Sequence, residues 1–258
     1  MNLNLFIYNF ERIRFNMKIF RFLRWQFLAS NKIGRYLKYA IGEIALVVIG
    51  ILIALQINNW NALKIKEKEE IQTYQQIKRQ ISEDQKKLIQ VRDLNNYHTL
   101  QFEKAIQIIS SKNKTKIDSL AILTMTLSQY SDFNCSAKIY ETLVNSGAVK
   151  LLKNKTISNK LQNLEITYSN VNKLEDIHWE IIMNELSPEV KGVINYATLE
   201  VVKPKKLYAV ELQNIFIECV FLTKAKDVIY NKCLMEVEEL IGILNDEIYL
   251  KSKGNEKI

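Results

Sequence analysis

Residues 40–57 read AIGEIALVVIGILIALQI, and this stretch decides where the chain resides. Its centre, Ile44–Leu55, consists of twelve consecutive apolar or small residues. At about 1.5 Å per residue, a helix of 18 residues spans roughly 27 Å, which is close to the hydrocarbon thickness of a bilayer. Tyr39 and Trp60 flank the stretch, where amphipathic rings favour the lipid headgroups. We therefore predict a transmembrane helix over residues 39–60.

Most of the positive charge of the chain lies before this helix. Residues 1–60 carry eight Lys and Arg side chains against two acidic ones, whereas the other 198 residues carry 28 basic and 26 acidic side chains. The positive-inside rule places the N-terminus in the cytoplasm and the bulk of the chain across the membrane. A nearly neutral folded domain also argues against nucleic-acid binding. The cations that set this topology include Lys18, Arg21, Arg24, Lys32, Arg35 and Lys38.

The basic leader, residues 1–38, carries an amphipathic pattern over residues 17–28. Two interpretations are open: a basic helix that lies flat in the cytoplasmic interface, or a charged leader that only sets the topology. Met17 is an alternative start of the chain. A cleaved signal peptide does not fit, because about 40 residues precede the apolar run and no A-x-A-like site follows it.

The rest of the chain is predicted to be helical, because seven glycines and two prolines in 258 residues leave few turn signals. Residues 61–112 are expected to form a long stalk helix that joins an antiparallel helical bundle built from the remainder, residues 113–250. A disordered tail is expected over residues 251–258. The stalk has apolar residues mostly at three- and four-residue steps, namely Ile71, Tyr74, Ile77, Ile81 and Leu88. The all-α class follows from this pattern.

Further helices are bounded by capping and breaking residues. After a helix over about 117–129, Ser136 is expected to cap a helix over about 137–145, which a left-handed terminus at Gly147 ends. Thr156 begins a helix that Pro188 is expected to end at about residue 186. The last long helix is expected over residues 207–250.

Two stretches resemble a known family. Residues 36–61, YLKYAIGEIALVVIGILIALQINNWN, look like the N-terminal signature of DUF6090, a bacterial family of uncharacterised membrane proteins. Residues 140–154, YETLVNSGAVKLLKN, are similar to the family's Y-x-x-L-x-x-S-G turn and the short helix after it. The resemblance implies a single-pass membrane protein of unknown function, with no catalytic residues to carry over.

The candidate functional residues of the anchor are the polar and small ones. Glu43, an ionisable group in a spanning segment, is expected either to reach the cytoplasmic headgroups or to contact another helix within the membrane. Gly42 and Gly50 offer small faces for helix association, and Gly50 with Ala54 makes a small-x-x-x-small step. Gln56 is expected to solvate the outer helix end.

The remaining polar side chains suggest no reaction. Asp176 and Glu180 share one face of a helix while His178 points away, so we interpret this group as a solvated surface with Trp179 in the core. His98 is isolated in the sequence. With no catalytic or nucleotide-binding motif present, we expect no enzyme, cofactor or metal site.

The three cysteines follow no metal-binding spacing. Cys219 and Cys233 would lie about 21 Å apart along one helix, so an intrachain disulfide would have to involve Cys135. We expect three buried free thiols.

Two functions from different classes remain. The first is a non-enzymatic scaffold or interaction protein of the bacterial cytoplasmic membrane, whose extracytoplasmic bundle binds a protein partner or a second copy of itself, with the lipid bilayer as the other partner. The alternative is a ligand-sensing helical ectodomain that works with a separate signalling partner.

Overall fold

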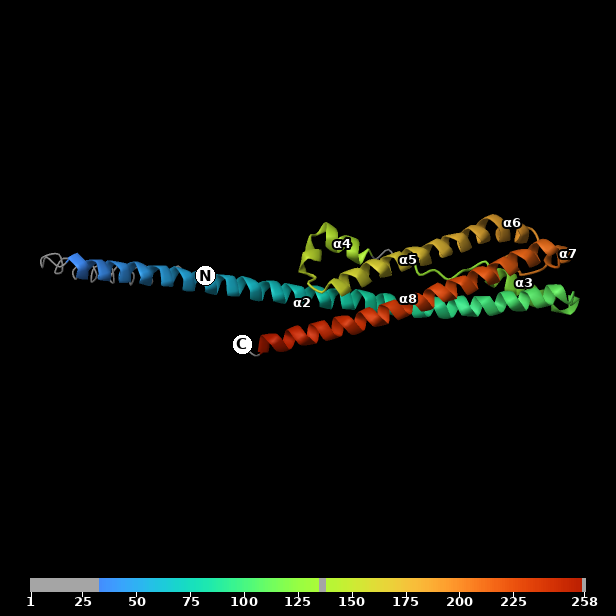
Figure 1. Ribbon diagram of the computed structural model, residues 1–258. Coiled ribbons are helices and arrows are strands. Elements are labelled where there is room, and N and C mark those ends of the chain that lie inside the picture. Colours follow the sequence, from blue (N-terminus) through green and yellow to red (C-terminus); the bar gives the residue numbers. More distant parts are fainter. Residues whose placement is uncertain (1–32, 135–137, 257–258) are drawn as a thin grey trace. The chain divides into compact units, whose positions relative to one another are not determined.

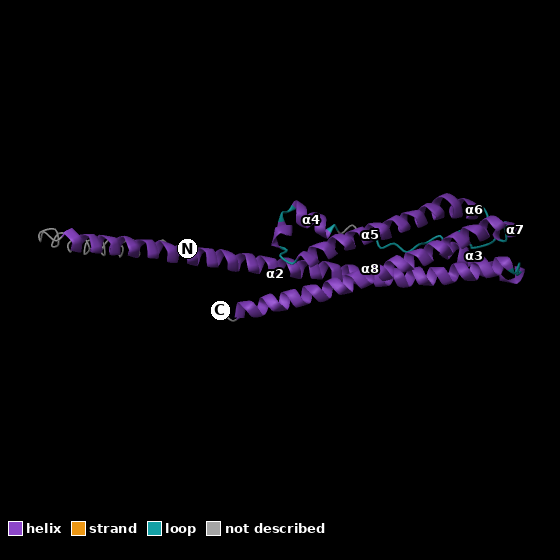
Figure 2. Ribbon diagram, in the orientation of Figure 1, coloured by secondary structure: helices purple, strands orange, loops and turns teal. Residues whose placement is uncertain are grey.

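The computed structural model describes residues 33–134 and 138–256, and within these ranges the chain is helical without any strand, apart from isolated bridges around Ile194 (Figures 1 and 2). The predicted all-α class is confirmed. The chain divides into two compact units, Met1–Ile65 and Lys66–Ile258.

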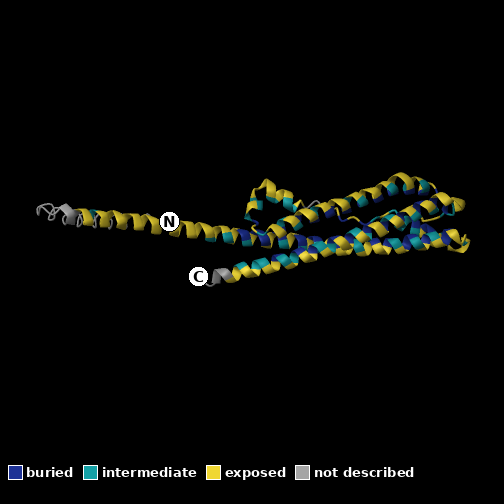
Figure 3. Ribbon diagram, viewed as in Figure 1, coloured by how far each residue is buried: buried dark blue, intermediate teal, exposed yellow. Residues whose placement is uncertain are grey.

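The described part of the first unit is helical and belongs to α2, Ile33–Ser110. Its apolar window is exposed throughout, with none of it buried inside the protein (Figure 3). By length and composition this helix could cross a membrane. The leader cations Lys18, Arg21, Arg24 and Lys32 and the amphipathic pattern over 17–28 lie outside the described residues.

The second unit is a bundle of three long helices: α2 from Lys66 onward, α5 over Lys155–Ile181 and α8 over Val210–Glu256. Helices α2 and α8 are antiparallel, because Glu70 pairs with Lys251 while Glu103, further along α2, pairs with the earlier Lys224. This agrees with the expected stalk helix packing into the bundle.

Helix α5 is antiparallel to α8 but parallel to α2. Lys160 near the start of α5 pairs with Glu239 near the end of α8. On the other side, the Tyr168 hydroxyl donates to the Asp84 carboxylate of α2. The parallel arrangement is possible because the chain between α2 and α5 returns to the end of the bundle where Lys66 begins the second-unit part of α2. Only part of the bundle is therefore antiparallel.

Short elements make the connections. After α2 come η1, a 3-10 turn over Lys114–Lys116, and α3, Ile117–Thr126, then irregular chain, α4 over Ile139–Asn145, and η2, a 3-10 turn over Ala148–Leu151. Gly147 has φ of +74°, which confirms the predicted left-handed end of α4. Ser136, the expected cap, lies outside the described residues, and Lys138 occupies the N-cap position without a side-chain cap bond.

The prediction that Pro188 ends its helix was wrong. After α5 the chain widens into η3, a π-helix over Ile182–Leu186, and then continues as α6, Ser187–Val190. In the wide turn the Ser187 N–H bonds the Ile182 carbonyl, and proline occupies the first turn of α6, where its missing N–H costs little. A short helix, α7 over Pro204–Leu207, precedes α8.

The expected disordered tail was also wrong for residues 251–256, which continue α8. Lys251 pairs with Glu70 at 3.2 Å and with Glu247 at 3.5 Å. The pair with Glu70 joins this part of α8 to α2, whereas the pair with Glu247 lies within α8.

The bundle core consists of two apolar clusters. One gathers around Phe102, Leu120 and Phe216 near α3 and α7, and the other around Leu161 and Leu240 near α4. Buried positions recur at three- and four-residue steps along all three helices, which is the spacing of helices that pack side by side (Figure 3). Four of the five predicted stalk residues, Tyr74, Ile77, Ile81 and Leu88, are buried as expected.

Candidate functional site

A layer of buried polar side chains separates the two apolar clusters. All three long helices contribute to it, together with Ser131 from the irregular segment after α3. We call it the central polar layer, and it consists of Asn95, His98, Ser131, Glu175, His178, Thr223 and Lys226, each of which is buried. In sequence order, each helix places these residues between its contributions to the two clusters.

Lys226 lies at the centre of this layer and is fully buried. Its ammonium group donates to the Ser131 carbonyl at 2.8 Å, to the Ser131 hydroxyl at 2.9 Å and to Nδ1 of His178 at 3.3 Å. Burial lowers the pKa of Lys226 to about 8, against the opposing attraction of the Glu175 carboxylate. The three donors of the ammonium thus have three protein acceptors.

Glu175 holds the same irregular segment from the other side. Its carboxylate accepts hydrogen bonds from the backbone N–H of Phe133 at 2.8 Å, from that of Asn134 at 3.1 Å and from the Tyr230 hydroxyl. Burial raises the pKa of Glu175, although these hydrogen bonds and Lys226 act to lower it. Buried backbone groups outside helices and strands need partners. Glu175 supplies them for the N–H groups of Phe133 and Asn134, and Lys226 supplies one for the Ser131 carbonyl.

The interpretation of Asp176 and Glu180 as a solvated surface is confirmed, because both side chains are exposed, but the placement of Trp179 in the core was wrong. His178 is fully buried and Trp179 is 46% exposed, so the core side chain is the histidine. Trp179 instead packs on the Tyr130 ring, with centroids 5.5 Å apart. The three-and-four spacing of α5 places Glu175 and His178 on its inner face. Extending the three-and-four pattern of buried positions along this helix to polar residues would have predicted that Glu175 and His178 are buried.

His98 was interpreted as isolated, but it lies in the same layer. Burial, reinforced by the charge of Lys226, lowers the pKa of His98 and lowers that of His178 to about 3. Both imidazoles are therefore neutral at physiological pH. His178 Nε2 and His98 Nδ1 are buried without a hydrogen-bond partner among the described residues.

This arrangement supports a structural role. A lysine with a pKa near 8 can act as a nucleophile when a substrate reaches it. Here the amine is fully buried and its donors are satisfied within the protein. The layer therefore fixes the irregular segment and the relative register of the three helices. In the described residues no group of three or more His, Cys, Asp or Glu side chains is placed to hold a metal ion.

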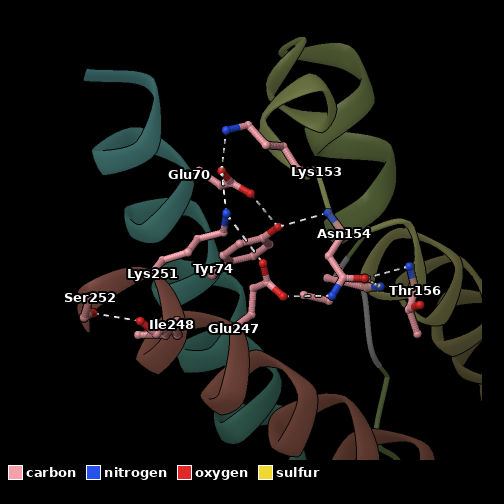
Figure 4. A network of polar contacts seen from close by, with 10 residues as sticks. Glu70, Tyr74, Lys153, Asn154, Thr156, Glu247, Ile248, Lys251 and Ser252 are labelled. Atoms are coloured by element: carbon pink, nitrogen blue, oxygen red, sulfur yellow. Dashed lines mark hydrogen bonds and ion pairs between the residues drawn. The ribbon is translucent and has the colours of Figure 1, made fainter. Parts of the chain in front are cut away.

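A second polar network lies near the C-terminal end of α8 (Figure 4). Glu70, fully buried, pairs with Lys251 at 3.2 Å and with Lys153 at 3.3 Å, and it accepts a hydrogen bond from the Tyr74 hydroxyl at 2.9 Å. Burial raises the pKa of Glu70, but the hydrogen bonds and the two lysines outweigh burial, so that its pKa lies below the ordinary value.

Asn154 connects this network to α5. Its side-chain oxygen accepts from the Thr156 backbone N–H at 2.9 Å, which makes it the N-cap of α5, and its side-chain nitrogen donates to Glu247 at 2.9 Å (Figure 4). The predicted cap, Thr156, lies two residues further on. The network therefore joins the beginning of α5 to the end of α8.

The candidate residues of the anchor belong to the first-unit part of α2, whereas both networks belong to the second unit. Gly42 and Gly50 have open space around them, and the Lys64 ammonium lies 4.2 Å from the centre of the Trp60 ring. Of the topology-setting cations, Arg35 and Lys38 lie within α2. The anchor residues that are exposed on this helix are Tyr39, Gly42, Glu43, Gly50, Gln56 and Trp60.

Cys219 and Cys233 lie on one continuous helix, as the sequence predicted. Cys219 and Cys233 both lie on α8 and both are buried. Burial raises the pKa of the Cys219 thiol to about 12, which makes it unreactive. Cys135 lies outside the described residues.

The comparison with protein families agrees with the sequence signature. The model of DUF6090, a family of unknown function, matches residues 43–225. The chain belongs to this family. The DUF6090 match begins inside the apolar stretch, includes all of α5 and ends within α8, so it covers the central polar layer up to Thr223. No curated protein and no solved structure matches the chain.

Proposed function

We propose that this DUF6090 protein is a single-pass protein of the bacterial cytoplasmic membrane that acts without catalysis, as a scaffold or interaction protein. In this proposal the leader lies in the cytoplasm and the bundle lies on the extracytoplasmic side. The exposed apolar helix and the excess of cations before it support this placement.

An outward apolar stripe on α8 carries the proposal. Phe221, Val228 and Met235 recur every seven residues on one face of the helix and are 70%, 71% and 71% exposed. Side chains seven apart lie above one another on a helix. Large apolar side chains in a row on a surface are typical of contacts with another protein.

The partner of this stripe is either a second copy of the chain or another envelope protein. Three side chains bury only part of the roughly 800 Å² per partner that a stable interface needs. Confinement to one membrane raises the effective concentration of the binding partners, so that a small surface suffices. Association of the anchors through Gly50 and Ala54 would add to it.

Crosslinking in intact membranes tests this function. A photoreactive phenylalanine analogue at Val228 should yield an adduct of one discrete mass, which is twice that of the chain if the partner is a second copy. The analogue at Ile166, an exposed apolar residue of α5, is the matched control and should yield none. Met235→Lys should reduce the Val228 adduct at least fivefold. Monomer alone at Val228, or equal adducts at both positions, would contradict the proposal.

Ligand sensing with a separate signalling partner is the second candidate function. One observation favours it: a pocket near α7 is lined by five lysines. A thermal-shift screen against envelope metabolites separates this candidate from the first, because a bound ligand raises the melting temperature by mass action.

A further inference from the structure

Helices α3 and α7 meet at one end of the bundle (Figure 1). A pocket of about 810 Å³ is lined there by residues of both helices and of the turns beside them. Two segments about ninety residues apart in the sequence form its walls: the turn that follows α2 and the chain that begins α7. Five of its eight lining residues are lysines, and the lining consists of Lys112, Lys114, Ile117, Lys203, Pro204, Lys205, Lys206 and Tyr208.

The two walls are fastened to each other. The Tyr208 hydroxyl donates a hydrogen bond to the Asn113 carbonyl at 2.8 Å, and so joins the end of α7 to the turn after α2. Leu207, next to Tyr208, is fully buried in the neighbouring apolar cluster. The Asn113 side chain caps η1 by accepting from the Thr115 N–H at 3.1 Å. The lysine backbones are therefore held in place without a ligand.

The charges of this pocket are poorly balanced within the protein. No carboxylate lines it. Among the described residues, only Lys206 of the five lysines has an ion pair, with Glu189 at 3.6 Å. Cations gathered in this way repel each other, and an anion that binds between them removes that repulsion. The bundle as a whole is nearly neutral, so the local excess is a property of this end.

We propose that this pocket binds an anion that carries phosphate groups with at least two negative charges. Lysine ammonium groups bind phosphate as compact point charges. Ile117, Pro204 and the Tyr208 ring form apolar wall between the lysines, against which an apolar part of the same ligand packs. The ligand class is shared by soluble phosphate compounds and by phospholipid headgroups. The site is independent of association through α8, and it would supply the ligand class for the sensing alternative.

Equilibrium dialysis of the full chain in phosphatidylcholine nanodiscs, with radiolabelled pyrophosphate as the probe, tests the proposal. One pyrophosphate should bind per chain, and binding should weaken as salt is added. The variant Lys112→Gln/Lys114→Gln/Lys203→Gln/Lys205→Gln should bind at least tenfold more weakly. The matched control is Lys66→Gln/Lys68→Gln/Lys86→Gln/Lys104→Gln, which removes the same charge from exposed sites on α2 and should change affinity less than twofold.

Photoreactive phosphatidic acid in the nanodisc identifies the source of the phosphate. Crosslinks on residues 112–117 or 203–208 that are lost in the pocket variant, without pyrophosphate binding, assign the pocket to a lipid headgroup. Pyrophosphate binding without such crosslinks assigns it to a soluble compound. The proposal is overturned if neither probe binds the pocket, or if both quadruple variants lose binding equally. Circular dichroism of the pocket variant establishes that its helices are intact.

Discussion

In the central polar layer, individual side chains make hydrogen bonds to backbone groups that helix or strand pairing would satisfy elsewhere. Residues 131–134 have no regular structure, and Glu175 accepts from the N–H groups of Phe133 and Asn134 while Lys226 donates to the Ser131 carbonyl. Removing one charge would leave the other buried and unpaired, which is more costly than the net value of the pair. His178 belongs to this group because its Nδ1 accepts from Lys226.

His178 should make the protein sensitive to acid. Burial lowers the pKa of His178 from 6.5 to about 3 in the folded state. Between these two pH values, the His178 imidazole is therefore protonated in the unfolded chain but neutral in the folded protein. The contribution of the neutral His178 to the free energy of unfolding is fully present above pH 6.5 and is lost progressively as the pH falls towards 3. In His178→Asn, the amide oxygen stands in for Nδ1 and does not titrate.

Between about pH 6 and about pH 4, wild type should therefore lose about 1.4 kcal/mol per pH unit more than His178→Asn. Urea unfolding of the full chain in detergent, followed by helical circular dichroism, measures this difference. Because Glu175, Lys226 and His98 remain in both proteins, their titration cancels to first order. Parallel pH profiles for the two proteins would contradict the assignment.

At the scale of elements, two of the chain's helix signals behave differently. Gly147 ends α4 in the left-handed conformation, as its sequence context predicts, whereas Pro188 does not end its helix. The difference is physical: a positive φ is a local property, but the effect of proline depends on whether the preceding turn can widen. Here η3 supplies the wider turn.

The two glycines Gly147 and Gly242 should respond oppositely to alanine. Gly147→Ala forces a side chain into φ of +74° and should destabilise the protein by about 1–2 kcal/mol. Gly242 lies on the exposed face of α8 with open space around it, so Gly242→Ala should stabilise by about 0.5–1 kcal/mol. Shifts of the urea midpoint, with an unchanged dependence of the unfolding free energy on urea concentration, measure both changes in stability. A shift of the same sign in both variants would refute this distinction.

At the scale of the whole molecule, the two units differ in whether their apolar side chains are exposed or buried. The first unit exposes its apolar side chains, while the second buries its apolar side chains around a polar layer. A helix whose apolar residues have no protein to pack against finds its favourable surroundings in lipid. By its length and composition, the helix of the first unit could cross a membrane.

The topology of the chain should follow its charge asymmetry. Protease added to the outside of spheroplasts should digest the region after Trp60, because the positive-inside rule predicts that the eight cations before the apolar stretch stay in the cytoplasm. Immunoblotting with an antibody against the C-terminus would record the loss, and a cytoplasmic marker protein should stay intact. Full protection of the bundle in intact spheroplasts, with digestion only after lysis, would reverse the orientation.

The sequence by itself determined the apolar stretch that could cross a membrane by its length and composition, the all-α class and most helix positions. These depend on local free energies: hydropathy over one helix length, three-and-four spacing and the scarcity of glycine and proline. The predicted burial of Tyr74 and Leu88 succeeded for that reason, since apolar residues at helical spacing have one favourable place.

Only the tertiary structure decided which polar residues are buried and where distant cations meet. Lys226 and Glu175 lie in the core because an irregular segment, remote in sequence, brings backbone groups that need them. The lysine pocket exists because the turn after α2 and the start of α7 meet at one end of the bundle. No local pattern encodes either meeting, since its free energy depends on contacts between segments that the chain brings together only on folding.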